Sequence, residues 1–501
     1  MGKMKLILDG RAVKRVKRAY DGITRRMYEH RIYIVAAVFI ASSAFFFAQF
    51  FTLHNWDMLV RIMNAGYLFH GGTYFENQRA IPESVVIGAL SFLLGGYAVY
   101  GFILLSALLF FFSLKEFSKS FNVDYLLLIL LAMNPFVLFY GIKNGSEMMM
   151  LSFLILFISC LKTRNPAAGV FFSLAFLSKY DALYFLPLFV FMLDFKTLRA
   201  LKKLLISLGL AILTLVPYLI YNLLTYRNLV FTFASSFLQN GYSVAIGAAA
   251  IANKYLFYGP YELLVLVPLV LLFVSINRQK RAIAFKQRRN IALLLSASVI
   301  GSIIYYSASG LYSQDLGYFR FFMPVLLLLA LLASLFLRKE DLIPLAAFSF
   351  VSFLIAVMML YSFMPAAYSE QHDSLVGISA FKGLYGTTMC TVQSNDWVYL
   401  DYYGLSATYI RNSSFYMYPI VSFGPVNTSL PLLSRTGGVY IYGSHSCAYT
   451  PPIDFPNGVN YDIALSRQND SIACYWLFDT HVRFTPGLDA CIALNDAFAG
   501  I

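Results

Sequence analysis

Long apolar segments recur between residues 32 and 363, and several reach the roughly 20 residues that a helix needs to cross a bilayer. The segment 204–223, for example, carries no charged residue. The chain as a whole is 59% hydrophobic and only 13% charged, whereas soluble domains carry about 25% charged residues. The sequence therefore predicts a polytopic, all-α membrane protein.

We expect a transmembrane bundle of about 11 helices over residues 32–363, with the N-terminus in the cytoplasm. This topology keeps the basic loop 277–290 on the cytoplasmic side, where Lys and Arg collect. The Gly95-Gly96 pair leaves an alternative open, in which 83–114 divides into two short spans. The expected spans are 32–53, 83–114, 123–140, 146–161, 166–178, 180–193, 204–223, 257–276, 291–309, 319–337 and 341–363.

Residues 1–31 combine many Lys and Arg residues with a periodic apolar pattern. One face of the predicted helix carries Val13, Val16, Tyr20, Ile23 and Met27, and the opposite face carries Lys14, Arg15, Lys17, Arg18, Arg25 and Arg26. We expect this basic amphipathic juxtamembrane helix to lie on anionic membrane lipids. A basic run can also bind nucleic acid, but the span that follows at once disfavours that reading, so we expect no nucleic-acid partner. The first span reads as an uncleaved anchor.

The tail, residues 364–501, differs in composition from the rest of the chain. Turn-forming residues separate short strand-like runs such as DWVYLDYY and GGVYIYG, which predicts a small mixed α/β domain on the extracytoplasmic side. An even number of cysteines in such a domain favours two disulfide bonds, with three pairings open; the candidates are Cys390, Cys447, Cys474 and Cys491. The cysteine and histidine spacings do not support zinc, and Asn412, Asn427 and Asn469 lie in glycosylation triplets.

The predicted topology gathers ionisable residues at the extracytoplasmic ends of several spans. They are Asp57 in the loop 54–82, Glu147 at the end of the turn 140–147, Lys179 and Asp181 in the turn 178–181, and Asp315 and Arg320 in the turn 309–320. Each alone could simply hold a helix end in the headgroups. Their coincidence on one side favours a functional site instead.

Carboxylates and cations at such a place suit transfer of a sugar from a lipid phosphate. A carboxylate can take the proton of an acceptor hydroxyl as that oxygen attacks the sugar. Cationic groups can hold the departing phosphate, and apolar walls between helices can hold a polyprenyl tail. A direct displacement of this kind inverts the anomeric centre.

Four stretches are similar to the GT-C superfamily of integral-membrane glycosyltransferases, which includes protein O-mannosyltransferases, aminoarabinose lipid A transferases and polyprenyl-phosphate-mannose-dependent mannosyltransferases. The first is Asp57 followed by NAGYLFHGGTY and Ile81-Pro82-Glu83. The other three are NPFVLFYGIKNGSEMMM with Glu147, FLSKYDALYFLPLF with Lys179, and YFRFFMPVLLLLALL with Arg320 and Pro324.

The resemblance implies a polyprenyl- or dolichyl-phosphate sugar as donor, of hexose and mannose type, and a glycan, lipid or protein as acceptor. It implies Asp57 as the catalytic base, Glu147 as a further catalytic acid, and Lys179 and Arg320 as residues facing the carrier phosphate. We add His54, Asn55, Trp56, Tyr74, Glu83, Asp181 and Asp315 as candidates for the substrate pocket. Glu83 is either a second carboxylate of the site or an acid that starts a helix, and the sequence favours the latter.

Three questions stay open at this point. A divalent metal, Mg²⁺ or Mn²⁺, is compatible with the family, whose members differ in metal use, although His54 and His70 have no ligand partner in the sequence. The membrane is the cell membrane in a prokaryote and the endoplasmic reticulum membrane in a eukaryote. The competing functions are a transporter or flippase of a lipid-linked substrate, which should show related halves, and a scaffold or receptor, which does not explain the gathered charges.

Overall fold

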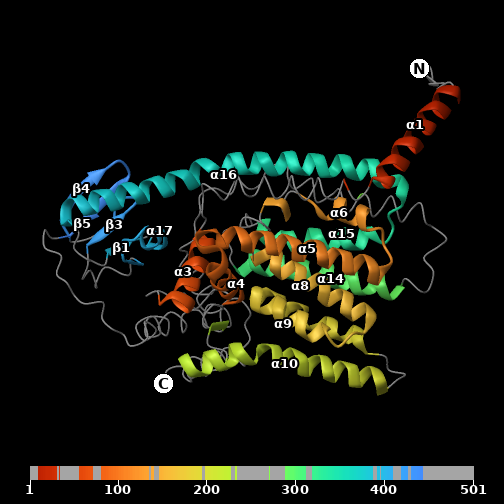
Figure 1. Cartoon of the computed structure of the whole chain (residues 1–501), viewed down its shortest axis with the longest axis horizontal. Coiled ribbons are helices and arrows are strands. Elements are labelled where there is room, and N and C mark those ends of the chain that lie inside the picture. Colours follow the sequence, from red (N-terminus) through yellow and green to blue (C-terminus); the bar gives the residue numbers. More distant parts are fainter. Residues whose placement is uncertain are drawn as a thin grey trace.

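The computed structural model describes residues 10–30, 33, 56–71, 81–134, 137–139, 146–193, 198–226, 229, 232–233, 270, 288–311, 319–386, 392–394, 397–409, 419–426 and 430–443. Most of them are helical, and a small sheet lies at one end of a group of long helices that run roughly side by side (Figure 1). The structure therefore agrees with the predicted combination of a helical bundle and a small domain with strands.

Each predicted span within the described residues contains a helix, but the helix in the span expected at 123–140 ends at Ala132, because Met133 and Asn134 are not helical. The helices are α4 (Ile81–Leu94) with α5 (Ala98–Phe121), α6 (Tyr125–Ala132), α8 (Ser146–Thr163), α9 (Ala168–Ser178), the 3-10 helix η2 (Tyr180–Met192), α10 (Leu198–Tyr226), α14 (Arg288–Leu311), α15 (Phe319–Ser334) and α16 (Leu342–Tyr385). Three helical segments of the described chain are long and apolar enough to cross a membrane, namely Pro82–Phe121, Leu198–Leu224 and Lys339–Met358. These three support membrane association. The count of eleven stays a prediction, because α6, α9 and η2 are shorter than a span needs and because all but one residue of each of 32–53 and 257–276 lie outside the described residues.

The segment predicted as one span over 83–114 is interrupted at the glycine pair. A short 3-10 helix, η1 (Gly95–Tyr97), separates α4 from α5, and Gly95 has φ +53°, a conformation that favours glycine. α4 has 14 residues, or about 21 Å at 1.5 Å per residue, which is shorter than the roughly 30 Å hydrocarbon core. α5, with 24 residues, is long enough to cross by itself. Leu90 and Leu94 of α4 lie close to Gly101 of α5, so the chain turns back at the interruption instead of continuing as one span, although α4 is too short to be a full span itself.

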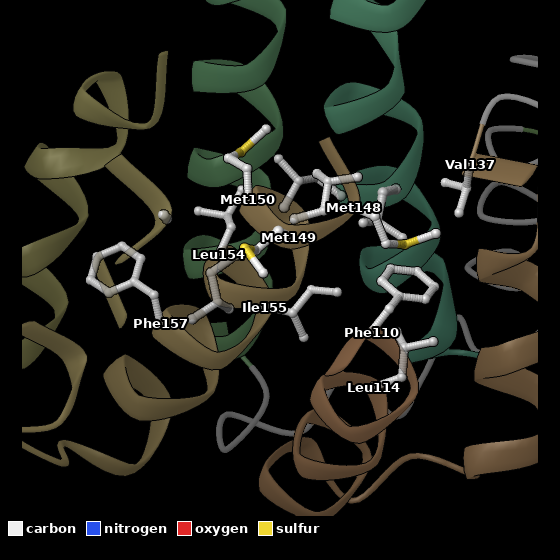
Figure 2. Packing of buried hydrophobic residues seen from close by; sticks show 14 of the residues in the cluster. Phe110, Leu114, Val137, Met148, Met149, Met150, Leu154, Ile155 and Phe157 are labelled. Atoms are coloured by element: carbon white, nitrogen blue, oxygen red, sulfur yellow. The ribbon is translucent and has the colours of Figure 1, made fainter. Parts of the chain in front are cut away.

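Apolar side chains from α5 and α8 form the centre of the bundle (Figure 2). Phe110 and Leu114 of α5 meet Met148, Leu154 and Ile155 of α8 in one buried cluster. An aromatic group continues this core, with centroid distances of 5.5 Å from Phe157 to Phe172, 5.1 Å from Phe157 to Phe189 and 5.3 Å from Phe172 to Phe189. These three rings join α8, α9 and η2.

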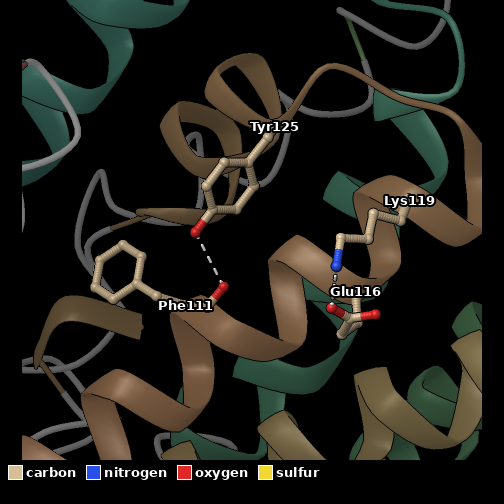
Figure 3. Close-up of polar contacts among 4 residues, drawn as sticks. All are labelled: Phe111, Glu116, Lys119 and Tyr125. Atoms are coloured by element: carbon tan, nitrogen blue, oxygen red, sulfur yellow. Dashed lines mark hydrogen bonds and ion pairs between the residues drawn. The ribbon is translucent and has the colours of Figure 1, made fainter. Parts of the chain in front are cut away.

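A tight polar turn connects α5 to α6. Asn122 has φ +55°, and the Asp124 carboxylate accepts hydrogen bonds from the backbone N–H groups of Leu126 and Leu127, which caps α6. The Tyr125 hydroxyl donates to the Phe111 carbonyl at 3.0 Å, so α6 folds back along α5; an ion pair of 2.7 Å between Lys119 and Glu116 lies on the same end of α5 (Figure 3).

The predicted basic helix forms as α1 (Gly10–Glu29), but part of its apolar face packs on protein. Met27 packs against a buried cluster of α6, α15 and α16. The Tyr28 hydroxyl donates to the Asp124 carboxylate, and the Tyr20 hydroxyl donates to the carbonyl of Glu340 in η5 (Lys339–Asp341). Lys17, Arg18, Arg25 and Arg26 are exposed. The expectation that one whole face rests on lipid therefore needs correction for Tyr20 and Met27.

The C-terminal region builds a five-stranded mixed sheet with the order β2-β1-β3-β5-β4. Its strands are β1 (Val392–Ser394), β2 (Ala407–Tyr409), β3 (Ile420–Ser422), β4 (Leu432–Thr436) and β5 (Val439–Tyr442). β1 is parallel to β2 and β3, and β5 is antiparallel to β3 and β4. GGVYIYG forms a strand as predicted. The prediction for DWVYLDYY is wrong, because that run forms the helix α17 (Trp397–Tyr402).

The long helix α16 connects the bundle to this sheet. Its 44 residues correspond to about 66 Å, twice the thickness of a hydrocarbon core, and it runs without interruption through the boundary expected at residue 363. Its last turns pack on the sheet region, where Ile378, Phe381 and Tyr385 are buried with Val421 and Ile441. Figure 1 shows α16 passing from the end that carries α1 to the end that carries the sheet.

Candidate functional site

The helix α3 (Trp56–His70) lies where the bundle meets the C-terminal region (Figure 1). Met58 and Ala65 belong to the buried cluster of the bundle, whereas Leu59 and Val60 belong to the buried cluster of the sheet and α17. All four are nearly or fully buried. The proposed base Asp57 is in the first turn of α3, so its backbone is positioned by both cores; the side chains of Trp56 and Asp57 lie outside the described part of the structure.

Two polar side chains of α3 are also buried. Arg61 is 5% exposed and Asn64 is fully buried. Arg61 follows Asp57 by four positions, and residues at that spacing share one face of a helix. The buried guanidinium interacts electrostatically with Glu83, in the first turn of the adjacent helix α4. Arg61 therefore joins the helix of the proposed base to the start of α4.

Glu83 is fully buried, which a residue that only starts a helix at a polar surface would not be. Apart from a contact with its own backbone amide, neither carboxylate oxygen has a hydrogen-bond partner among the described residues. It interacts electrostatically with Arg61, Glu147 and Tyr180. Glu83 thus faces a group of polar residues contributed by three other segments of the chain.

Lys179 lies between two of the predicted acids. Its Nζ is 3.7 Å from Glu147 Oε1 and 3.4 Å from Asp181 Oδ2. Glu147 is in the first turn of α8 and Asp181 in the first turn of η2, where acids interact favourably with the helix N-terminus. Lys179 has an extended backbone between α9 and η2. The Glu147 side chain is 3% exposed, whereas those of Lys179 and Asp181 are 19% and 34% exposed, so the pair is accessible from the Lys179 side.

Tyr180 connects this charged group to a polar network on α10. The Tyr218 hydroxyl shares a 2.6 Å hydrogen bond with Thr232 Oγ1, and the Tyr180 hydroxyl lies 3.4 Å from that of Tyr218 and 3.5 Å from Thr232. Asn222 accepts a hydrogen bond from the Thr232 amide. These contacts fix the start of η2 against α10, and with it the backbone of Lys179 and Asp181.

The structure therefore brings together Glu83, Glu147, Lys179 and Asp181 of the predicted site. Arg320 lies in the first turn of α15, but its side chain is outside the described residues. The predictions for His54, Asn55, Tyr74 and Asp315, and for the cysteines Cys390, Cys447, Cys474 and Cys491, also fall outside them. Sequence reasoning missed Arg61 and Tyr180. Arg61 could have been found from its helical spacing of four residues from Asp57. For Tyr180 the only signal in the sequence was its position between the charged residues Lys179 and Asp181.

Metal ligands are not gathered in this part of the chain: among the described residues, no group of three or more His, Cys, Asp or Glu side chains could hold an ion. The site joins three acids and two cations from α3, α4, α8 and the junction of α9 with η2. No protein-family model matches the chain, and no curated protein sequence matches it.

Proposed function

We propose that the protein is a membrane glycosyltransferase. It transfers a hexose of the mannose type from a polyprenyl- or dolichyl-phosphate carrier. The acceptor is a glycan, a lipid or a protein on the extracytoplasmic side. Three apolar helices long enough to cross a membrane support a lipid-linked donor. The proposal also draws on the resemblance of the four motifs to the GT-C superfamily, and it places the protein in the cell membrane of a prokaryote or the endoplasmic reticulum membrane of a eukaryote.

The observation that carries the proposal is the charged group around Lys179. A cation in contact with two carboxylates, next to a buried acid and a buried arginine, is costly to maintain where the surroundings are apolar. It adjoins α3, the helix that begins with Trp56 and Asp57. A plain helix end needs no such group, whereas phosphate and sugar recognition needs both cations and carboxylates.

In the proposed reaction Asp57 accepts the proton of the acceptor hydroxyl. The acceptor oxygen forms a bond to the anomeric carbon while the bond from that carbon to the phosphate oxygen breaks, and the lipid phosphate leaves with the electron pair. Lys179 and Arg320 stabilise the departing phosphate. Lys179 is partly exposed, so it can contact a phosphate while Glu147 keeps its ammonium group in place.

The test uses the purified protein in lipid nanodiscs with radiolabelled polyprenyl-phosphate mannose and polyprenyl-phosphate glucose, and with membranes of the expressing cell as acceptors. We expect release of polyprenyl phosphate and label in the acceptor fraction, both lost in Asp57→Asn. Glu116→Gln is the matched control, because that acid pairs with Lys119 near the C-terminal end of α5 and is not part of the charged group around Lys179. Full activity in Asp57→Asn would refute the assignment of the base. Movement of intact donor across the bilayer without transfer would instead support the transporter or flippase.

A further inference from the structure

Glu83 is the buried polar group that the proposed reaction leaves without a task. Its side chain is fully buried, and its oxygens meet only its own amide among the described residues. Burying a polar group without hydrogen bonds is unfavourable, and burying a charged group is more so. Such a group is retained where a ligand completes its hydrogen bonds. Glu83 is therefore the strongest indication in the described chain of a contact reserved for a substrate.

Glu83 interacts electrostatically with one residue from each half of the proposed reaction. Arg61 is on α3 together with Asp57, the proposed base for the acceptor. Glu147 contacts Lys179, which is proposed to face the carrier phosphate. The transferred sugar must lie between acceptor and phosphate. Glu83 thus borders the position of the sugar ring, not that of the lipid.

We propose that Glu83 binds a hydroxyl group of the transferred sugar and that this sugar carries no negative charge. The inference rests on the proposed glycosyltransferase function and deepens it by assigning Glu83 to recognition of the donor sugar. A hydroxyl group both donates and accepts, so it satisfies Glu83 in either protonation state. An anionic sugar such as a uronic acid would bring a further carboxylate beside Glu83 and Glu147, and like charges at a buried site are strongly unfavourable.

The test compares Glu83→Leu and Glu83→Gln in the nanodisc assay, using polyprenyl-phosphate mannose and its monodeoxy analogues as donors. Glu83→Leu is expected to lower kcat/KM for the intact donor about 10- to 100-fold, the size of a lost hydrogen bond that leaves a buried hydroxyl group unpaired. Glu83→Gln is expected to stay within about 5-fold of the wild type, because an amide still binds a hydroxyl. For the one analogue that lacks the contacted hydroxyl, the effect of Glu83→Leu should nearly disappear. Glu116→Gln is again the control.

Several results would overturn the inference while leaving the function intact. One is an equal loss in Glu83→Gln and Glu83→Leu, which would assign Glu83 to proton transfer or charge. Another is a Glu83→Leu variant that loses the same activity with every deoxy donor. A third is transfer of glucuronate from its polyprenyl phosphate as fast as transfer of mannose. If Glu83→Leu does not fold, the activity of Glu83→Gln and the rates of the wild type with the monodeoxy donors test the inference instead. No transfer by the wild type from any donor would instead refute the proposed function itself.

Discussion

Met58 and Leu59 are neighbours in the chain, yet Met58 packs in the core of the helical bundle and Leu59 packs in the core of the C-terminal region. Successive residues of a helix point about 100° apart, so one short helix can join two cores. α3 does this directly after Asp57. The C-terminal region therefore holds the helix of the proposed base in place, in addition to any contact with an acceptor.

Leu59→Ala should weaken this attachment. Removing a fully buried leucine side chain costs about 2–5 kcal/mol. We expect faster amide hydrogen exchange in α3 and in α17, with slow exchange kept in α8, and we expect sugar transfer to fall. Leu59→Met, which conserves volume, is the control and should cost less than about 1.5 kcal/mol. Unchanged exchange in both helices would show that the two cores are not coupled through α3.

Removing Lys179, which leaves the buried Glu147 without this partner, should cost more stability than removing the charge of Asp181. Glu147 is nearly buried, and loss of a buried partner costs about 3–5 kcal/mol, whereas an exposed pair contributes about 0–1 kcal/mol. Lys179→Met should therefore lower the melting temperature much more than Asp181→Asn, whose acid is partly exposed. Thermal unfolding in the same nanodiscs ranks the variants. Lys179→Arg should restore most of the stability, and equal melting temperatures for all three would contradict the buried pair.

The sequence predicted the helices of the bundle well because membrane spans depend on local composition. The runs 146–161 and 166–178 differ by few residues from α8 and α9. The same local reasoning failed for DWVYLDYY, whose β-favouring aromatic residues form α17. There Trp397, Val398 and Leu400 pack against the sheet region and α3, so tertiary contacts decide the conformation.

The candidate site was only partly predictable from the sequence. Glu147 and Lys179 were found because ionisable residues coincide at the ends of several predicted spans on one side of the membrane. The sequence favoured Glu83 as a helix-start acid because that position is a common one for acids. Its burial depends on α3 folding over the start of α4, and the pairing with Arg61 depends on the same contact. Neither feature has a local signature in the sequence.

The contact of Tyr28 with Asp124 should hold α1 against the bundle. The Asp124 carboxylate caps α6 and also accepts the hydrogen bond of the Tyr28 hydroxyl. Asp124→Ala should cost about 0.5–2 kcal/mol through the lost cap and should also release α1. Because Arg25 and Arg26 are exposed, trypsin should then cleave α1 faster than in the wild type. Asp21→Ala, which removes an exposed acid of α1, is the control. Equal cleavage rates in all three proteins would mean that Tyr28 does not hold the helix.

Substitution of glycine by alanine should have opposite effects on stability at Gly169 of α9 and at Gly209 of the neighbouring helix α10. A Cβ atom at Gly169 of α9 would lie 1.7 Å from the carbonyl oxygen of Ser207 in α10, whereas a Cβ atom at Gly209 would meet nothing within 4 Å. The close approach is reinforced by the Ser173 hydroxyl, which donates to the Ala211 carbonyl at 2.9 Å.

Gly169→Ala must push α9 away from α10, and overpacking of this kind costs about 1–3 kcal/mol. Since α9 leads directly into Lys179, we also expect a higher KM for the lipid donor. Gly209→Ala lies in the middle of α10 and should stabilise the protein by about 1 kcal/mol through helix propensity. Thermal unfolding and donor KM measured on both variants test the packing. If Gly169→Ala were as stable as Gly209→Ala, the contact between α9 and α10 would have to be looser than the Gly169–Ser207 approach requires.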